Sequence, residues 1–371
     1  MNRSANPKRW WACVATLMLG GMLAACDANH DPKNTGSGKL TPAQQKAAVK
    51  MVAAAEKTYQ AFLNSEASRP SSPPLFDLKV AWSRNLGNAQ VAASQTPDER
   101  AAALQGHLDR VTKMRASPGD AEWPGRSESY AFAVAEAEYV IAADQAKGEP
   151  TSAMLSAADR MLRAAQGAYD GLMRLPDQQL RTPEYVELRL AWLRRTARAE
   201  LGTRSTAVQR LTVLEADLAR MDSVVAWVAR QNPDVTAAIR NQAEYAAAEA
   251  DFMLTANAGV RPKLNADQQA AAERMARTAD SAMRSLDELE AVHARTPEFL
   301  YLRMVYSRRV AEAGMRLHPK GAERRSAQED YLKRAKWTAE HAVLHTDPVF
   351  PNYAAMTAYA VAEAEYWLAE P

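Results

Sequence analysis

The sequence has little cysteine, few aromatic residues and almost no runs of β-branched residues, and each shortage excludes a class of protein. Cys13 and Cys26 are the two cysteines among 371 residues, and both precede the part that can fold, so a disulfide-stapled domain is excluded. The lack of β-branched runs argues against a sheet. No phosphate loop, nucleophile elbow or cysteine nucleophile occurs, so no enzyme motif is present and no enzymatic activity or cofactor is expected.

An excess of either charge is also lacking. The formal net charge is +2, and removing Arg3, Lys8 and Arg9 with the first 25 residues, which hold no acid, leaves −1. A near-neutral chain gives no reason to expect a nucleic-acid partner. Two short basic clusters are interpreted as solvated helix faces: Arg194, Arg195 and Arg198, and Lys333, Arg334 and Lys336.

Strong helix formers are what the sequence has in abundance. Hydrophobic residues make up 47% of the chain and aromatic residues 7%, with alanine carrying much of the apolar share beside Leu, Met, Glu, Arg and Gln. These residues have high helix propensity. The composition therefore predicts an all-α protein.

The first 25 residues have the pattern of a secretory signal peptide. Three basic residues precede a short apolar run, which ends in small residues, and the run is too short to cross a bilayer, which takes about 20 residues. The segment Leu23-Ala24-Ala25-Cys26 resembles a bacterial lipobox. The resemblance implies cleavage before Cys26, a diacylglyceryl group on its thiol and a third acyl chain on the new amine. These chains, palmitate among them, would anchor the protein to a membrane. The alternative is an ordinary signal peptide with an accidental cysteine.

The residues after the lipobox predict where the protein would be held. Residues 26–40 are rich in Gly, Ser, Asn, Asp and Pro, and they predict a flexible tether. The lipobox resemblance implies a bacterial envelope protein facing the periplasm. Asp27 resembles an inner-membrane retention signal, which favours the inner over the outer membrane.

A long internal repeat organises the remainder, residues 41–371. One nine-residue segment occurs three times, once in divergent form, at residues 131–139, 244–252 and 358–366. Its central glutamates, Glu136, Glu249 and Glu363, are spaced by 113 and 114 residues. A fixed long period is the signature of a repeat array. The spacing predicts three units of four helices each, at residues 41–150, 151–264 and 265–371.

Capped helix starts and the long period together predict the architecture. A Thr or Asn followed by Pro satisfies the first helical turn, and five such pairs begin at Thr41, Thr96, Thr182, Asn232 and Thr296. Twelve helices in six antiparallel hairpins would form an α-solenoid. The arrangement resembles tetratricopeptide and related helical-repeat proteins in architecture only, because the 34-residue period and the consensus positions of that family are not matched.

Recurring charges inside apolar stripes predict buried ion pairs. At about 100° per residue, the central glutamate of each nonapeptide shares a helix face with aromatic residues. An earlier helix of each unit carries a basic residue within its own apolar stripe: Lys79, Arg189 and Arg303. Buried charges are paired because an unpaired one costs several kcal/mol. The prediction is one structural pair per unit: Lys79–Glu136, Arg189–Glu249 and Arg303–Glu363. The alternative is that these charges line a ligand groove.

Two further constellations are weighed and set aside. His341 and His345 are four residues apart, a spacing that can hold a metal, but they have no counterpart in the other units, so no metal site is expected. Ser127-Glu128-Ser129 contains a Glu-Ser pair that resembles one in lytic transglycosylases. No segment resembles the catalytic domain of those enzymes.

Two functions from different classes remain open. The first is a lipid-anchored envelope protein whose helical-repeat surface binds a protein partner, in a scaffold, assembly or inhibitory role. Repeat proteins offer long binding surfaces, and a tether lets such a surface search near the membrane. The second is an accessory lipoprotein that binds a small molecule or a glycan, for example beside a transporter.

Overall fold

A computed structural model describes residues 40–65, 73–115, 123–146, 150–176, 180, 183–204, 206–230, 237–256, 266–293, 297–342 and 353–370. The signal peptide, Cys26, Asp27 and nearly all of the predicted tether lie outside the described residues. Within the described residues the structure is helical, with twelve helices and no strand. The expectation of an all-α fold is therefore confirmed. None of the described helices has the length and apolar character needed to cross a membrane.

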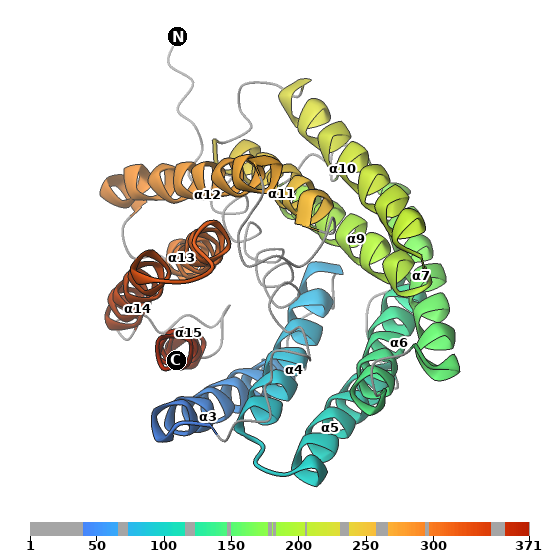
Figure 1. Ribbon diagram of the computed structural model, residues 1–371, viewed down its shortest axis with the longest axis horizontal. Helices are drawn as coiled ribbons and strands as arrows, with labels where there is room; N and C mark the ends of the chain where they lie inside the picture. The colour runs from blue at the N-terminus through green and yellow to red at the C-terminus, as the bar shows by residue number, and fades with distance from the viewer. Residues whose placement is uncertain are drawn as a thin grey trace.

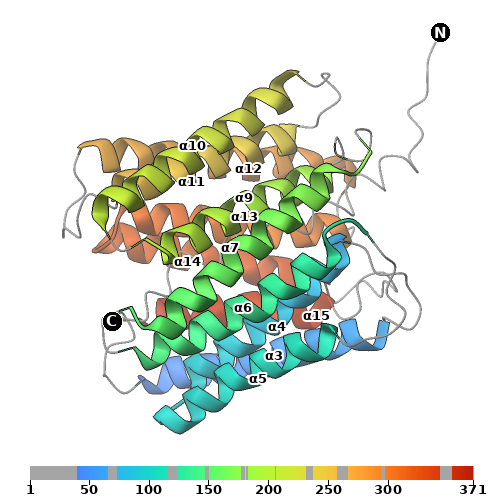
Figure 2. The ribbon, with the colours of Figure 1, turned by 90° about the vertical axis from the view of Figure 1, so that its right-hand side faces the viewer.

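The helices follow one another around a ring (Figure 1). Their bounds are α3 Pro42–Ser65, α4 Pro73–Ala93, α5 Pro97–Arg115, α6 Arg126–Gln145, α7 Ser152–Met173, α9 Pro183–Gly202, α10 Ala207–Arg230, α11 Ala237–Ala256, α12 Ala266–His293, α13 Pro297–Leu317, α14 Ala322–Ala342 and α15 Tyr353–Leu368. Each helix packs against the next one in the chain. Figure 1 shows α4, α9 and α13 nearer the middle than α5, α10 and α14, and Figure 2 shows the helices of one side lying roughly parallel.

Helix starts follow the capping chemistry of the sequence where they are described. The Thr96 hydroxyl accepts from the Glu99 backbone N–H at 3.2 Å, and the Glu99 carboxylate accepts from the Thr96 N–H at 3.2 Å. This reciprocal pair is a capping box. Thr41 and Gln44 make the same exchange at the start of α3. These bonds satisfy backbone donors that have no partner within the helix.

The last helix packs against the first, so the series of neighbours returns to its start. Contacts between α15 and α3 are as extensive as those between α6 and α7 or between α11 and α12. The Trp82 and Tyr359 rings meet edge to face at 5.5 Å across this closure, as Phe132 and Trp192 do at 5.4 Å elsewhere in the ring. An open solenoid would leave α3 and α15 apart, whereas here the first and last helices are in contact. The repeat pattern had made no prediction about this closure.

Ion pairs at matching repeat positions mark the three places where α6, α11 and α15 meet α7, α12 and α3. The pairs are Glu138 with Arg160 at 2.6 Å, Asp251 with Arg274 at 3.4 Å, and Glu365 with Lys50 at 2.7 Å. All are partly solvent-exposed, so each contributes little stability by itself. Their recurrence shows that the closing contact uses the same kind of seam as the two internal ones.

Candidate functional site

The three repeated glutamates are buried among the inner helices, at 3% exposure for Glu136, 8% for Glu249 and 6% for Glu363. Glu136 on α6 pairs with Arg84 on α4, and its other oxygen lies 3.1 Å from Nη1 of Arg198 on α9. One carboxylate thus joins three helices. Burial by itself would raise the pKa of Glu136, but Arg84 and Arg198 outweigh it and lower the pKa to about 2.

The second and third glutamates are held in the same way. Glu249 on α11 lies 3.1 Å from Nε of Arg194 on α9 and 3.4 Å from Nη1 of Arg316 on α13. Glu363 on α15 lies 3.1 Å from Nε of Arg308 on α13, and the Tyr331 hydroxyl of α14 donates to it at 2.9 Å. All of these partners are protein groups, so the carboxylates act as links between helices.

The basic partners differ from those predicted by the sequence. The arginines that meet the three glutamates stand five positions further along the helix, at Arg84, Arg194 and Arg308. The pairing of Arg189 with Glu249 was wrong, because the Arg189 guanidinium lies over the Trp227 ring of α10 at 5.4 Å. The helix is buried on two sides, and its two basic positions face different neighbours.

Of the other two predicted partners, Arg303 also meets a different acid. Arg303 pairs with Asp287 on α12 and stacks over the Trp337 ring of α14 at 4.2 Å, while Glu363 is held by other groups. Lys79 is buried on α4, as its stripe indicated, and Glu136 meets Arg84 and Arg198. The Lys79–Glu136 pair itself stays a prediction. Inward-facing charges therefore recur, in a different pairing.

A second set of buried pairs connects the inner helices of successive repeats. Arg195 on α9 meets Asp77 on α4 at 2.6 Å, and Arg309 on α13 meets Glu187 on α9 at 3.1 Å. The basic cluster around Arg195, expected on a solvated face, is thus largely inside. The sequence contained a signal for this, since Arg195 and Arg309 occupy matching repeat positions 114 residues apart, as do their arginine neighbours.

Two buried carboxyl groups have pKa values near neutrality. Burial raises the pKa of Asp217 to about 7, against the pull of Arg194 and Arg220. Burial likewise raises the pKa of Glu312 to about 7, although Arg308 and Arg316 oppose it. Groups with such values can transfer protons, but they also occur in structural networks. Both lie inside a network that recurs along the ring, which favours the structural interpretation.

A serine–histidine pair in the first repeat has the residue types of a nucleophile and base but is closed to solvent. Ser83 Oγ lies 2.9 Å from His107 Nδ1, and Arg110 Nε donates to the same hydroxyl at 3.1 Å. Burial and the nearby Arg84 lower the pKa of His107 to about 3, so the ring is neutral at physiological pH. Both side chains are buried, so a substrate would have no access to the hydroxyl.

The histidine pair considered as a metal site is only partly described. The His341 ring stacks on Trp337 with centroids 3.8 Å apart, and its Nδ1 lies 2.7 Å from the Trp337 carbonyl oxygen. His345 lies outside the described residues. Among the described residues, no three His, Cys, Asp or Glu side chains are grouped so that they could hold a metal ion.

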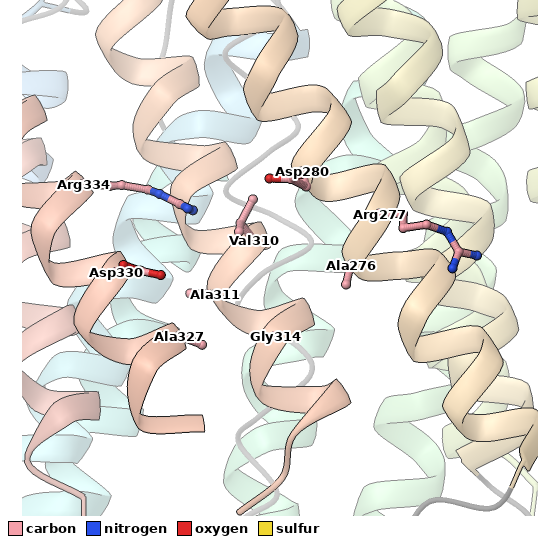
Figure 3. A pocket seen from close by; sticks show the side chains of 9 residues that line it. All are labelled: Ala276, Arg277, Asp280, Val310, Ala311, Gly314, Ala327, Asp330 and Arg334. Carbon is pink, nitrogen blue, oxygen red and sulfur yellow. The ribbon is translucent and has the colours of Figure 1, made fainter. Parts of the chain in front are cut away.

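A groove of about 340 Å³ opens on the outside of the third repeat, between α12, α13 and α14 (Figure 3). It is lined by Ala276, Arg277, Asp280, Val310, Ala311, Gly314, Ala327, Asp330 and Arg334. Small apolar residues form most of the lining. Arg334 and Asp280 point toward one another across the groove, whereas Arg277 points away (Figure 3). The sequence analysis did not identify this groove.

Comparison of the chain with protein-family models, with curated proteins and with solved structures gives no match.

Proposed function

We propose that this protein is a lipid-anchored component of a bacterial envelope, and that its helical ring binds a protein partner in a scaffold, assembly or inhibitory role. Cys26 would carry the lipid, and residues 26–40 would tether the ring to the inner membrane, on its periplasmic face. The role is binding and not catalysis. The observation that carries the proposal is the contrast between a charged interior and the accessible groove beside Arg334.

The ring itself is proposed to consist of three equivalent four-helix units. Its support is the recurrence of contacts at matching repeat positions: an inner carboxylate held by an arginine of the same repeat, and an acid–base pair at each seam. A pattern built three times favours a structural role, because a single reaction does not need three copies of its site. Rigid closed scaffolds suit binding, since little conformational entropy is lost when a partner docks.

The partner hypothesis is tested by photo-cross-linking in cells. A photoreactive amino acid replaces Arg277 beside the groove, and a matched variant carries it at Val49, which is exposed on α3. We expect the Arg277 variant to cross-link to a discrete envelope protein that mass spectrometry identifies. Cross-linking of the same proteins from both positions, or from neither, would contradict a partner at the groove.

The anchor is tested separately. Cys26→Ser should leave the chain unprocessed or release it from membranes, and labelled palmitate should enter only the wild type. Absence of label in the wild type would refute the anchoring.

One observation favours the second candidate, an accessory protein for a small molecule or glycan. The groove volume of about 340 Å³ falls within the range of small-ligand sites, at the lower end. Native mass spectrometry of the intact protein purified from its host would show a retained small molecule under this alternative. A spectrum with no added mass, together with a cross-linked partner, would favour the first candidate.

A further inference from the structure

The groove occupies a place that a glutamate side chain fills in the second repeat. Gly314 on α13 stands 114 residues after Glu200 on α9, and Arg334 on α14 stands 114 residues after Arg220 on α10. In the second repeat, Glu200 Oε2 lies 3.7 Å from Arg220 Nη2, and its Oε1 lies 3.3 Å from Arg204 Nη2. The third repeat keeps the arginine and lacks the carboxylate.

The first repeat satisfies the same arginine position in another way. Its residue Arg110 turns onto α4, where Nε donates to Ser83 Oγ at 3.1 Å and Nη2 donates to the Ser83 carbonyl at 3.2 Å. In the third repeat, Arg334 lines the open groove and makes no ion pair with any residue in the described part of the chain. Two of the three repeats thus supply their own partner for this arginine, and the third leaves it available.

We propose that the groove binds a carboxylate carried on a short aliphatic stem, and that its source is the glutamate side chain of a protein partner. The carboxylate would meet the Arg334 guanidinium as Glu200 meets Arg220. This inference deepens the proposed function and rests on it for the identity of the source.

The lining suits such a side chain. Ala276, Ala311 and Ala327 offer small apolar contacts for two methylene groups. Gly314 lets α13 approach α14 closely, since a Cβ there would lie 3.1 Å from that of Ala327. The carboxylate of Asp280 is already engaged, since it accepts from Arg284 Nε at 3.0 Å. Asp330 is exposed at the edge of the groove, where its charge is screened by solvent and weakens carboxylate binding only modestly. An arginine–carboxylate pair in this setting gives charge selectivity.

The test uses the intact protein and three capped tripeptides, Ala-Glu-Ala, Ala-Gln-Ala and Ala-Asp-Ala, with amide backbone resonances followed by NMR titration at millimolar concentrations. We expect saturable shifts confined to α12, α13 and α14 with the glutamate peptide. Binding of the glutamine peptide should be weaker by about tenfold or more, the loss expected when a charge-assisted hydrogen bond is missing. The aspartate peptide should also bind more weakly, because its stem is one methylene shorter and its carboxylate falls short of Arg334. Equal binding of the glutamate and glutamine peptides would overturn the proposal.

Matched variants separate the groove from general attraction to charge. Arg334→Gln should abolish glutamate-peptide binding, and Arg325→Gln, which is exposed on the same helix and is not part of the groove lining, should leave it unchanged. Asp330→Asn should strengthen it, because a like charge is removed. Binding that survives Arg334→Gln would refute the site. If butyrate binds and the glutamate peptide does not, the groove takes a free acid and the protein source is refuted. If the peptide binds but no partner is cross-linked in cells, the carboxylate site is supported and only the proposed function is contradicted.

Discussion

Replacing Glu249 by alanine tests the buried network most directly. Its two oxygens lie 3.1 Å from Arg194 and 3.4 Å from Arg316, and all three side chains are at most 14% exposed. The change strands two guanidinium groups between α9, α11 and α13. Breaking a buried pair on one side costs about 3–5 kcal/mol.

The loss can be converted into a melting temperature. An unfolding entropy of about 2.1 cal/mol/K per residue gives roughly 0.7 kcal/mol/K for residues 41–371. Glu249→Ala should therefore lower the melting temperature by about 4–7 °C in differential scanning calorimetry. Asp251→Ala is the matched control on the same helix, because its pair with Arg274 is partly exposed and should cost no more than about 1 kcal/mol.

A rescue variant distinguishes stranded charge from lost packing. Glu249→Leu combined with Arg194→Met and Arg316→Met leaves neither guanidinium without its carboxylate and should recover most of the stability. Asp217 and Glu312 each keep one arginine neighbour, Arg220 and Arg308. Arg189→Met should cost less than Arg194→Met alone, since Arg189 contributes only a contact with the Trp227 ring. Equal effects of the Glu249 and Asp251 changes, or a triple variant no more stable than Glu249→Ala, would refute this reasoning.

Three further predictions concern pH, close packing and ring closure. Glu312 has a folded-state pKa of about 7 against an ordinary value of 4.5, so its stabilising effect is complete below pH 4.5 and is lost as the pH rises through 7. Glu312→Gln should thus gain stability relative to the wild type between pH 5 and pH 8, by up to about 3 kcal/mol in urea titrations, and a pH-independent difference would contradict the raised pKa. Gly171→Ala should destabilise the protein, because the new Cβ would lie 2.5 Å from backbone atoms preceding α6. Gly167→Ala should cost less, because its closest contact, at 2.7 Å, is Cγ of Glu128, a side-chain atom that can move. Equal melting points of the two variants would disprove this. A carbodiimide should couple Lys50 to Glu365 within one molecule, and peptide mapping would detect the cross-linked peptide. Glu365→Gln should prevent the coupling. Absence of the cross-linked peptide in the wild type would indicate an open ring.

The sequence was sufficient to predict which glutamates are inside but not which arginines meet them. The helical wheel places Glu136 on an aromatic face, and this follows from residue spacing alone. To choose between the two basic positions of the partner helix, one must know how that helix crosses its neighbours. Arg84 faces α6, whereas the position represented by Arg189 faces the next outer helix. A wheel shows one buried stripe, and this helix is buried on two sides.

Ring closure was also beyond the repeat pattern, because curvature is the sum of small rotations between neighbouring helices. A signal was nevertheless present. Ala47, Ala48 and Met51 on α3 are buried, as are the residues at the matching places of α7 and α12. The end helix of an open array would carry a polar outer face at these positions. An apolar face on the first helix requires a partner, and α15 supplies it.

The groove could not be predicted from the sequence for a different reason. Its signal is a loss, since Gly314 replaces the glutamate of the second repeat while the arginine across from it remains. Sequence comparison within the chain can find such a loss only once the structure shows that the two positions face each other.

The contact between α15 and α3 has a consequence for where along the ring the chain can begin and end. Because the Lys50–Glu365 seam matches the other two seams, no repeat is distinguished as first by its packing. A circular permutant that joins the present ends and begins between α6 and α7 would keep every helix contact while exchanging a covalent link for a non-covalent one. Permutation is tolerated where the ends of a domain lie close together at the surface. The proposed tether could thus be attached beside any of the three seams without changing the packing of the ring.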